Sequence, residues 1–520
     1  MTTDFIWAGF AAWALFDGRM IVLEGGWRNL CGNHHIRKCP DVGLDPSLCF
    51  AERVASHQGA LVGIWACRRS QEGKLFLCRG SLDVLDNSLI RLKRFGKSLH
   101  LRRVTLQHGF RAALKGKPLP PGRLRILSST ALANQFLLLE ESRRLGPIFK
   151  VWWGGKFTTC IVGHEIGRKF LTENEGKTKA ATTDLSDLFP FGFLRALEGE
   201  THRKYRRIFI DVFKGLDLAD HDAFLRRVVR KVLVQLAQME GPLSAATITR
   251  AFKKATTEMQ LRLILGVKRD DPLYEPLAKA YDDYAPNGIF LVAKDKHRAA
   301  YRRLRALVGQ VIEKGATPDS LLGVALSKGD PDETVLGNLI QMTEASRYDL
   351  HGLWFWIMNM LSRDPSILAR VRATAPGPER RAFARSVAQE SLRMEQSEFI
   401  HRATTRDIVF DGFFLPKDTR VRICVWEGHR DPSKFAEPST FDTERFLGEK
   451  HSMDTYAPFG MDKHRCLGGD WTIETSAVFI EELASTLEWD VVSDGPPARG
   501  VFHFEPSSAF SARLKLLQDA

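Results

Sequence analysis

The sequence predicts a mainly α-helical protein with a minor β component. Between residues 200 and 350, apolar side chains recur at spacings of three and four, which is typical of amphipathic helices. Short strand-like runs occur only near residues 148–162 and 408–425. The chain has 520 residues with 44% apolar content, which is enough for a large buried core. These features favour a globular, helix-rich domain.

The predicted elements follow one another from a turn-rich segment at Lys117–Gly122, whose prolines and glycine mark a boundary. We therefore expect residues 116–520 to form the main domain. Pro365 should end one long helix, because proline disfavours helix at the preceding residue. The remaining elements are expected as helices at 129–144, 333–363 and 470–487, and strands at 148–151, 158–162, 408–410 and 420–425.

Residues 1–115 show poor helical periodicity and receive no predicted fold. We expect an N-terminal extension that is either disordered or a start that does not belong to the folded protein. Two thiols and two imidazoles lie within nine residues there and could bind zinc, although structural zinc sites usually use two separated pairs. These residues are Cys31, His34, His35 and Cys39. The eight cysteines are scattered, and their spacing indicates no disulfide framework.

The formal net charge of +13 is concentrated in a basic segment at 87–125, which contains no acidic residue. Such a segment can lie on an anionic membrane surface, and a solvated linker explains it equally well. Nothing in the sequence indicates nucleic-acid binding. No stretch reaches the about 20 apolar residues of a spanning helix. We expect an intracellular protein that is cytoplasmic or peripherally attached to a membrane.

The most informative residue is Cys466, which lies in a loop between Phe459-Gly460 and Leu467-Gly468 and directly before the last predicted helix. A thiolate held by small residues can ligate a heme iron, while a buried free thiol is the simpler explanation. Upstream, Glu390 and Arg393 have i, i+3 spacing and share a helix face. Arg445 follows in the segment Phe441–Phe446.

This order and spacing resemble a cytochrome P450, over roughly residues 118–520. The resemblance implies a large helical domain and a small β-rich subdomain with heme b between them. Cys466 would be the axial iron ligand, with Phe459 and Gly468 matching the loop motif; Asp462 replaces a glycine of that motif. Glu390 and Arg393 would lock to Arg445 and brace the loop. The heme propionates would be held by His202, Arg206, Arg402 and His464.

The helix at 333–363 should cross the opposite face of the heme. The family's A-G-x-D/E-T pattern falls on Ala345-Ser346-Arg347-Tyr348-Asp349, so Asp349 stands where the family has threonine. A protonated carboxyl can act as a general acid, which makes Asp349 a candidate proton relay. An ion pair with Arg347 is the alternative. This helix is most similar to the branch of prostacyclin synthase and sterol 7α-hydroxylases, which also lacks the threonine.

The resemblance implies a monooxygenase that inserts one atom of O2 into a hydrophobic small molecule such as a lipid, terpenoid, steroid or other secondary metabolite. Electrons would come from a separate donor, either cytochrome P450 reductase or a ferredoxin, and we expect a monomer. The missing threonine motivates a peroxide isomerase, dehydratase or peroxygenase as the alternative. A catalytically inactive heme-fold protein is the second alternative. The aromatic run Trp354–Trp356 is expected to be core packing.

Overall fold

The structure is a computed structural model, and it divides into two units, Met1–Arg102 and Arg103–Ala520. It describes residues 96–517 apart from 125–130, 132, 154, 182–183, 286–293, 397–398, 449 and 501–502. Within 1–95 it describes only the backbone of the strands and of the helix that begins there. The proposed zinc ligands Cys31, His34, His35 and Cys39 lie outside the described residues.

The first unit contains antiparallel strands in the order β1-β2-β3-β4-β5-β6, followed by the start of helix α2 (Asp83–Leu114). The sequence had left this region without a fold and had set the domain boundary at 115/116. The strands are β1 (Ile6–Ala8), β2 (Ala11–Phe16), β3 (Arg19–Val22), β4 (Cys49–Ala55), β5 (Leu61–Arg68) and β6 (Leu75–Gly80).

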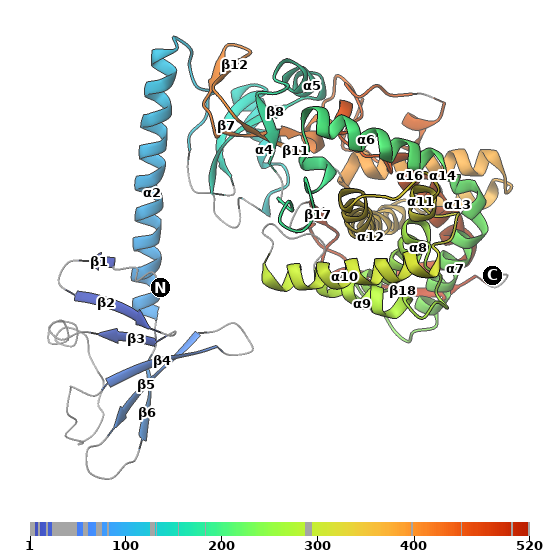
Figure 1. The fold of residues 1–520 in the computed structure, drawn as a ribbon, viewed down its shortest axis with the longest axis horizontal. Helices are drawn as coiled ribbons and strands as arrows, with labels where there is room; N and C mark the ends of the chain where they lie inside the picture. Colours follow the sequence, from blue (N-terminus) through green and yellow to red (C-terminus); the bar gives the residue numbers. More distant parts are fainter. Residues whose placement is uncertain are drawn as a thin grey trace. The chain divides into compact units, whose positions relative to one another are not determined.

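The second unit is built around helix α12 (Glu333–Arg363), which Figure 1 shows surrounded by α6, α8, α11 and α16. The prediction for this helix is confirmed at both ends. The Asp332 carboxylate caps its start by accepting from the N–H groups of Thr334 and Val335. Pro365 begins the next helix.

The second unit contains further helices besides α12. They are α4 (Leu137–Leu145), α5 (His164–Glu173), α6 (Gly199–Lys214), α7 (Asp222–Ala237), α8 (Ala245–Leu265), α9 (Tyr274–Tyr284), α10 (Asp295–Lys314), α11 (Leu321–Ser327), α13 (Pro365–Ala373), α14 (Pro378–Ser391), α15 (Val425–Gly428) and α16 (Gly469–Thr486). Single 3₁₀ turns include η2 (Leu194–Ala196), η3 (Leu218–His221), η5 (Thr443–Phe446) and η6 (Asp462–His464), and η4 (Leu392–Gln396) is a π-helical turn.

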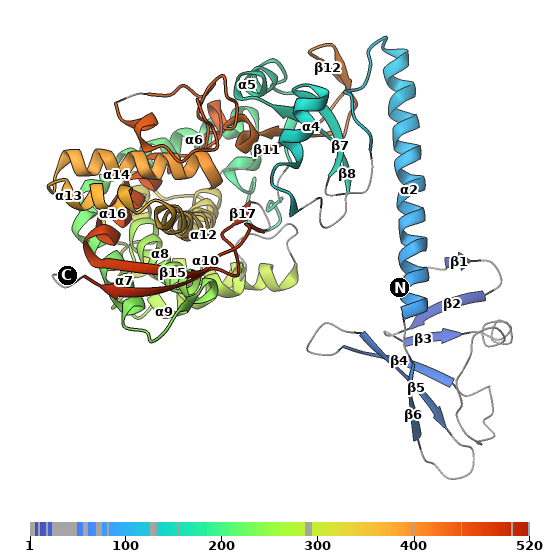
Figure 2. The ribbon, with the colours of Figure 1, turned by 180° about the vertical axis from the view of Figure 1, so that it is seen from behind.

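The main sheet of this unit has five strands in the order β7-β8-β14-β11-β9, with β8 and β14 parallel. Figure 1 and Figure 2 show it beside the helical part, next to α4 and α5. Its strands are β7 (Ile148–Trp153), β8 (Lys156–Val162), β9 (Thr178–Ala180), β11 (Phe399–Thr404) and β14 (Arg420–Cys424). Smaller sheets pair β10 (Leu243–Ser244), β18 (Ser511–Leu516) and β15 (Leu487–Ser493), then β12 (Ile408–Phe410) with β13 (Phe413–Leu415), and β16 (Ala498–Arg499) with β17 (Phe504–Glu505).

The helix predicted over 129–144 is interrupted. Among the described residues, Ala131 and Ala133 are helical, a turn follows at 134–136, and α4 begins at Leu137. The Asn134 side-chain oxygen accepts from the Phe136 N–H at 2.9 Å. Such a bond competes with the helical ladder and explains the interruption.

The aromatic run on α12 is core, as predicted. Trp354 is fully buried and stacks on Phe479 of α16, with ring centroids 4.5 Å apart. Trp356 is also buried, and its indole N–H donates to the Phe504 carbonyl at 3.2 Å. These contacts anchor α12 to α16 and to β17. They thereby position Asp349, which lies earlier on the same helix.

Candidate functional site

The Cys466 loop is held by backbone hydrogen bonds and one left-handed residue. The Cys466 N–H donates to the Phe459 carbonyl at 2.8 Å. Asp462 has φ +49, a conformation that suits glycine and that Asp adopts more readily than most residues. Its carboxylate lies 3.3 Å from Arg168 Nε. Asp462 therefore adopts a backbone conformation that a glycine at this position would also accept.

The Cys466 side chain borders an internal space. Of the cysteines that the structure describes, Cys160 and Cys424 are buried and Cys466 is exposed. Burial nevertheless raises the pKa of the Cys466 thiol, while a hydrogen bond from the Gly468 N–H acts in the opposite direction. We call the region between Cys466 and α12 the central space, because the charge of Asp349 on α12 acts across it on the Cys466 thiol.

Asp349 of α12 borders the same space. Its side chain is exposed, yet burial raises the pKa of its carboxyl, and its charge acts on the Cys466 thiol. Arg347 is held by Glu344 at 2.7 Å and by Asp282 at 2.8 Å on another face of the helix. The acid and the thiol thus approach the central space from two separate elements.

Ala345 and Ser346, the two other residues predicted on α12, present no ionisable group to the central space. Ala345 and Ser346 are half-buried. The Ser346 hydroxyl donates to the Met342 carbonyl at 2.7 Å, within its own helix. Ser346 is therefore tied to the backbone of α12, and Asp349 is the ionisable group that this stretch presents to the central space.

Sequence reasoning missed Arg195, a third ionisable residue that interacts with Cys466 and Asp349. It lies on η2, directly before α6, and it is exposed although burial lowers the pKa of its guanidinium. Asp349 and Cys466 stabilise its charge, and Arg402 opposes it. No sequence motif marks this arginine, and only the fold brings it opposite α12 and the Cys466 loop.

The four residues expected at the propionates are brought together by the fold. The rings of His202 and His464 lie 4.2 Å apart, and burial followed by the charges of His464 and Arg206 lowers the pKa of His202 to about 4. Glu198, also missed from sequence, joins them. It lies 2.7 Å from Arg402 Nη2 and 3.7 Å from His464 Nε2. Burial alone would raise the pKa of Glu198, but these two partners outweigh it and lower that pKa.

The Glu390–Arg393 pair is fully buried and holds the segment that precedes the Cys466 loop. Arg393 donates to both Glu390 oxygens at 2.6 and 2.7 Å, and Arg445 Nε lies 3.6 Å from Glu390 Oε1. Arg393 also donates to the carbonyls of His429 and Thr440 at 2.9 and 3.1 Å. This arrangement joins α14 to the chain between β14 and the loop.

A C-terminal hairpin adds a second set of residues that the sequence did not reveal. The Tyr348 hydroxyl donates to Glu505 Oε1 at 3.1 Å, and the His503 ring lies 5.6 Å from the Tyr348 ring. His503 is buried, and its charge lowers the pKa of Asp349 against the larger effect of burial. The hairpin therefore contributes a titratable neighbour to Asp349.

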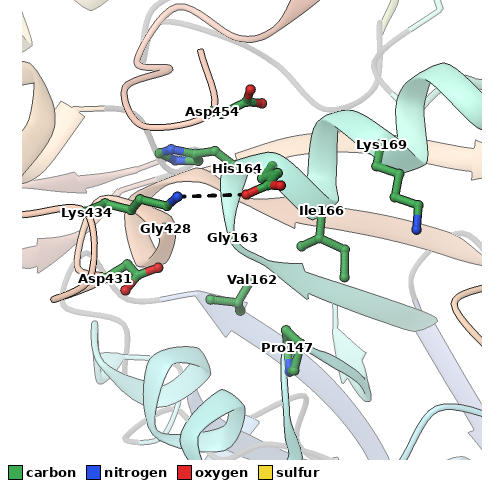
Figure 3. Close-up of a pocket in the computed structure, with 11 residues that line it drawn as sticks. Pro147, Val162, Gly163, His164, Ile166, Lys169, Gly428, Asp431, Lys434 and Asp454 are labelled. Carbon is green, nitrogen blue, oxygen red and sulfur yellow. Dashed lines mark ion pairs between the residues drawn. The ribbon is translucent and has the colours of Figure 1, made fainter. Parts of the chain in front are cut away.

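A separate surface pocket of about 360 Å³ lies elsewhere, between β8, α5 and α15 (Figure 3). Glu165 and Lys434 face each other across it at 3.8 Å. Its other charged residues, Lys169, Asp431 and Asp454, are of both signs. None of the residues that border the central space takes part in it, so this pocket is distinct from the candidate site.

Similarity to known proteins extends over most of the chain. The family model described as Cytochrome P450 matches residues 356–499, which contain the brace and the Cys466 loop. Abscisic acid 8'-hydroxylase 2 of Oryza sativa subsp. indica is 25% identical over 443 residues, covering 76% of this chain and 86% of that protein. The chain belongs to the cytochrome P450 superfamily. Its activity class is that of a P450 monooxygenase.

Solved P450 structures show the same fold. Retinoic acid-bound cyanobacterial CYP120A1 has a TM-score of 0.61 and 22% identity, and it covers 77% of this chain and 100% of that chain. A complex of cytochrome P450 OleT with arachidonic acid has a TM-score of 0.59 and 17% identity, covering 77% and 99%. Among the described residues, no helix is both long and apolar enough to cross a bilayer.

The cofactor of this P450 is heme with a cysteine thiolate ligand, and the residues present fit that group. Within the matched region, Cys424 is buried in the sheet, whereas Cys466 faces the central space. Arg206 lies near enough to Cys466 for the thiol to influence its pKa. Cys466 can supply the sulfur ligand of the iron, and Arg206 and Arg402 can pair with the two heme propionates.

Proposed function

We propose that this P450 inserts one oxygen atom from O2 into a hydrophobic small molecule of the lipid, terpenoid or steroid type. One observation carries the proposal: Cys466 in its loop and Asp349 on α12 come from separate elements, and the charge of Asp349 acts on the Cys466 thiol. When bound, heme with a thiolate ligand supplies oxygen activation. The similarity to abscisic acid 8'-hydroxylase 2, a plant enzyme, supports a role in terpenoid or other secondary metabolism.

Each residue of the site has a proposed task. Cys466 ligates the iron, and the Gly468 N–H lowers the pKa of its sulfur. His202, Arg206, Arg402 and His464 hold the propionates. Phe459 supports the loop, because a side chain at Gly469 would meet its ring at 3.0 Å. The Glu390, Arg393 and Arg445 group keeps the loop in place.

Asp349 is proposed to donate the proton that oxygen activation consumes. Burial raises the pKa of its carboxyl, so the group retains a proton to higher pH than an exposed aspartate. A positioned acid of this kind contributes about 10²-fold or more to a rate. The charge of His503 lowers the pKa of this carboxyl, but the effect of burial is larger.

Electrons are proposed to come from a separate donor, either a cytochrome P450 reductase or a ferredoxin. Arg465 is exposed next to Cys466, and Lys463 is partly exposed in the same loop. Basic side chains there complement an acidic redox protein. A monomer remains our expectation.

The test separates this proposal from the peroxide-using alternative, which is favoured by the absence of a free alcohol on α12 near Asp349. Purified protein is supplied with isotopically labelled O2 and a reductase, and separately with a hydroperoxide. Labelled oxygen in the product supports the monooxygenase. Turnover with the hydroperoxide alone supports an isomerase, dehydratase or peroxygenase instead.

A peripheral membrane contact through the basic segment at 87–125 is a second proposal. On α2, Leu106, Phe110 and Leu114 are between 67% and 74% exposed and follow one helix face. The opposite face packs on the sheet, where the His108 ring lies 5.0 Å from Phe157. An apolar stripe on a basic helix suits an anionic lipid surface. Binding to vesicles with anionic but not neutral lipid, lost when the three apolar residues become serine, would support it.

A further inference from the structure

Glu198 places a carboxylate on the side of α6 that carries two of the residues expected at the heme propionates. It is the N-cap residue of α6, and its carbonyl accepts from the His202 N–H at 3.2 Å. A spacing of four residues brings Glu198, His202 and Arg206 to one side of the helix. The carboxylate makes no capping bond to α6. An acidic group therefore stands where the resemblance predicts only arginine and histidine.

The Glu198 carboxylate is bound by residues of that same set. Its Oε1 lies 2.7 Å from Arg402 Nη2 and accepts from the Ala180 N–H at 3.1 Å. Its Oε2 lies 3.7 Å from His464 Nε2. Burial alone would raise the pKa of Glu198, but His464 and Arg402 outweigh burial and lower that pKa. The carboxyl is therefore ionised at neutral pH.

Arg402 is held in place by other contacts as well. Its Nε donates to Thr178 Oγ1 at 3.2 Å, and its Nη2 donates to the Thr178 carbonyl at 3.2 Å. The pairing of β11 with β9 also places Arg402 opposite Ala180. A role for Glu198 in orienting Arg402 would thus duplicate contacts that β9 already makes. The distinct contribution of Glu198 is its negative charge.

The positive charge of this set at neutral pH is lower than its four members indicate. Burial, followed by the charges of His464 and Arg206, lowers the pKa of His202 to about 4, so this ring is neutral. Glu198 offsets the charge of Arg402. The same residues would also have to accept the two negative charges of the heme propionates. Carboxylates that share one cation repel each other, and more strongly where protein excludes water.

We propose that Glu198 competes with a heme propionate for Arg402 and thereby weakens the hold of this P450 on its heme. The inference rests on the proposed function, which assigns Arg402 to the propionates. Among the described residues, Glu198 is the one carboxylate paired with Arg402. Without that charge, the guanidinium can pair with the propionate alone. The Glu198–Arg402 pair still stabilises the heme-free chain, so the gain concerns heme retention.

The experiment measures how fast the full-chain ferric holoprotein releases its heme to excess apomyoglobin, followed by the Soret absorbance. Each protein is loaded either with hemin or with hemin dimethyl ester, in which both propionates are uncharged. The variants are Glu198→Gln, Glu198→Ala and Arg402→Gln. The matched control is Glu200→Gln in the first turn of α6, where the glutamate side chain is 89% exposed. Circular dichroism checks the fold of every variant.

We expect Glu198→Gln to slow hemin release about tenfold, because the amide keeps an acceptor for the Ala180 N–H but carries no charge. Glu198→Ala should also slow hemin release. Neither variant should change release of the dimethyl ester, and Glu200→Gln should change neither rate. Arg402→Gln should speed the release of hemin and not that of the ester.

Hemin release from Glu198→Gln at the wild-type rate or faster would overturn the proposal. Equal slowing with the dimethyl ester would overturn it too, since the effect would not involve a propionate. Failure of both Glu198 variants to fold would show that Glu198 has a structural role instead. Arg402→Gln distinguishes the two levels of the argument. If it leaves hemin release unchanged, the propionate site of the proposed function fails; if it speeds release while Glu198→Gln does not slow it, only the role of Glu198 fails.

Discussion

Replacing Glu390 by glutamine should destabilise the protein by about 3–5 kcal/mol, because the carboxylate uses both oxygens as acceptors. Oε2 accepts from Arg393 Nε at 2.6 Å, and Oε1 accepts from Arg393 Nη2 at 2.7 Å and from the Asp442 N–H at 2.9 Å. A glutamine must turn an N–H donor toward one of these donors. Arg393, which is fully buried, would also lose its counter-charge.

The matched control is Glu333→Gln, which breaks another two-bond pair with Arg305, at 2.8 and 2.5 Å, on the surface. That change should cost less than about 1 kcal/mol, since exposed ion pairs contribute little. Denaturant unfolding of both variants would be followed by circular dichroism and by heme absorbance. The loss expected for Glu390→Gln is a large fraction of the about 5–15 kcal/mol that stabilises a typical protein. A loss no greater than that of the control would refute the reasoning.

Three other changes test the site. Asp462→Val should lower the free energy of unfolding by about 1–2 kcal/mol, because a β-branched residue is strained at φ +49. Asp462→Gly should lower it less, and thermal unfolding of both variants would show this order. Asp349→Asn should lower product formation about 100-fold and divert electrons to peroxide, measured as product per reduced donor consumed. The wild-type protein should also lose stability relative to Asp349→Asn as pH rises above the ordinary aspartate pKa, because the folded state binds that proton more tightly. Glu198→Gln should cost about 1 kcal/mol at pH 7, with the difference vanishing as pH falls through the lowered pKa of Glu198, as seen in denaturant midpoints at several pH values.

Local signals were enough for the sequence to predict some elements. The end of α12 was predicted from Pro365, and the Asp332 cap that the structure shows at its start also acts within a few residues. The Cys466 loop and the Glu390–Arg393 pair were also readable, because their spacing along the chain reflects their geometry. Where a competing local bond intervened, as at Asn134, periodicity alone predicted one continuous helix where the structure has a turn at 134–136.

The residues that sequence reasoning missed owe their positions to long-range packing. Arg195 stands on a single 3₁₀ turn, Glu198 directly precedes α6, and His503 lies in a hairpin near the C-terminus. Each meets its partners across more than a hundred residues of chain or through another element. Arginine, glutamate and histidine are common on surfaces, so only their place around the central space distinguishes them.

The most direct test of the central claim is the carbon monoxide difference spectrum of the reduced protein and of Cys466→Ser. We predict the red-shifted Soret band of thiolate-ligated heme in the wild-type protein and its loss in the variant, with Cys424→Ser retaining it. A wild-type protein that binds no heme, or a Soret band that is unchanged in Cys466→Ser, would contradict the assignment of the iron ligand.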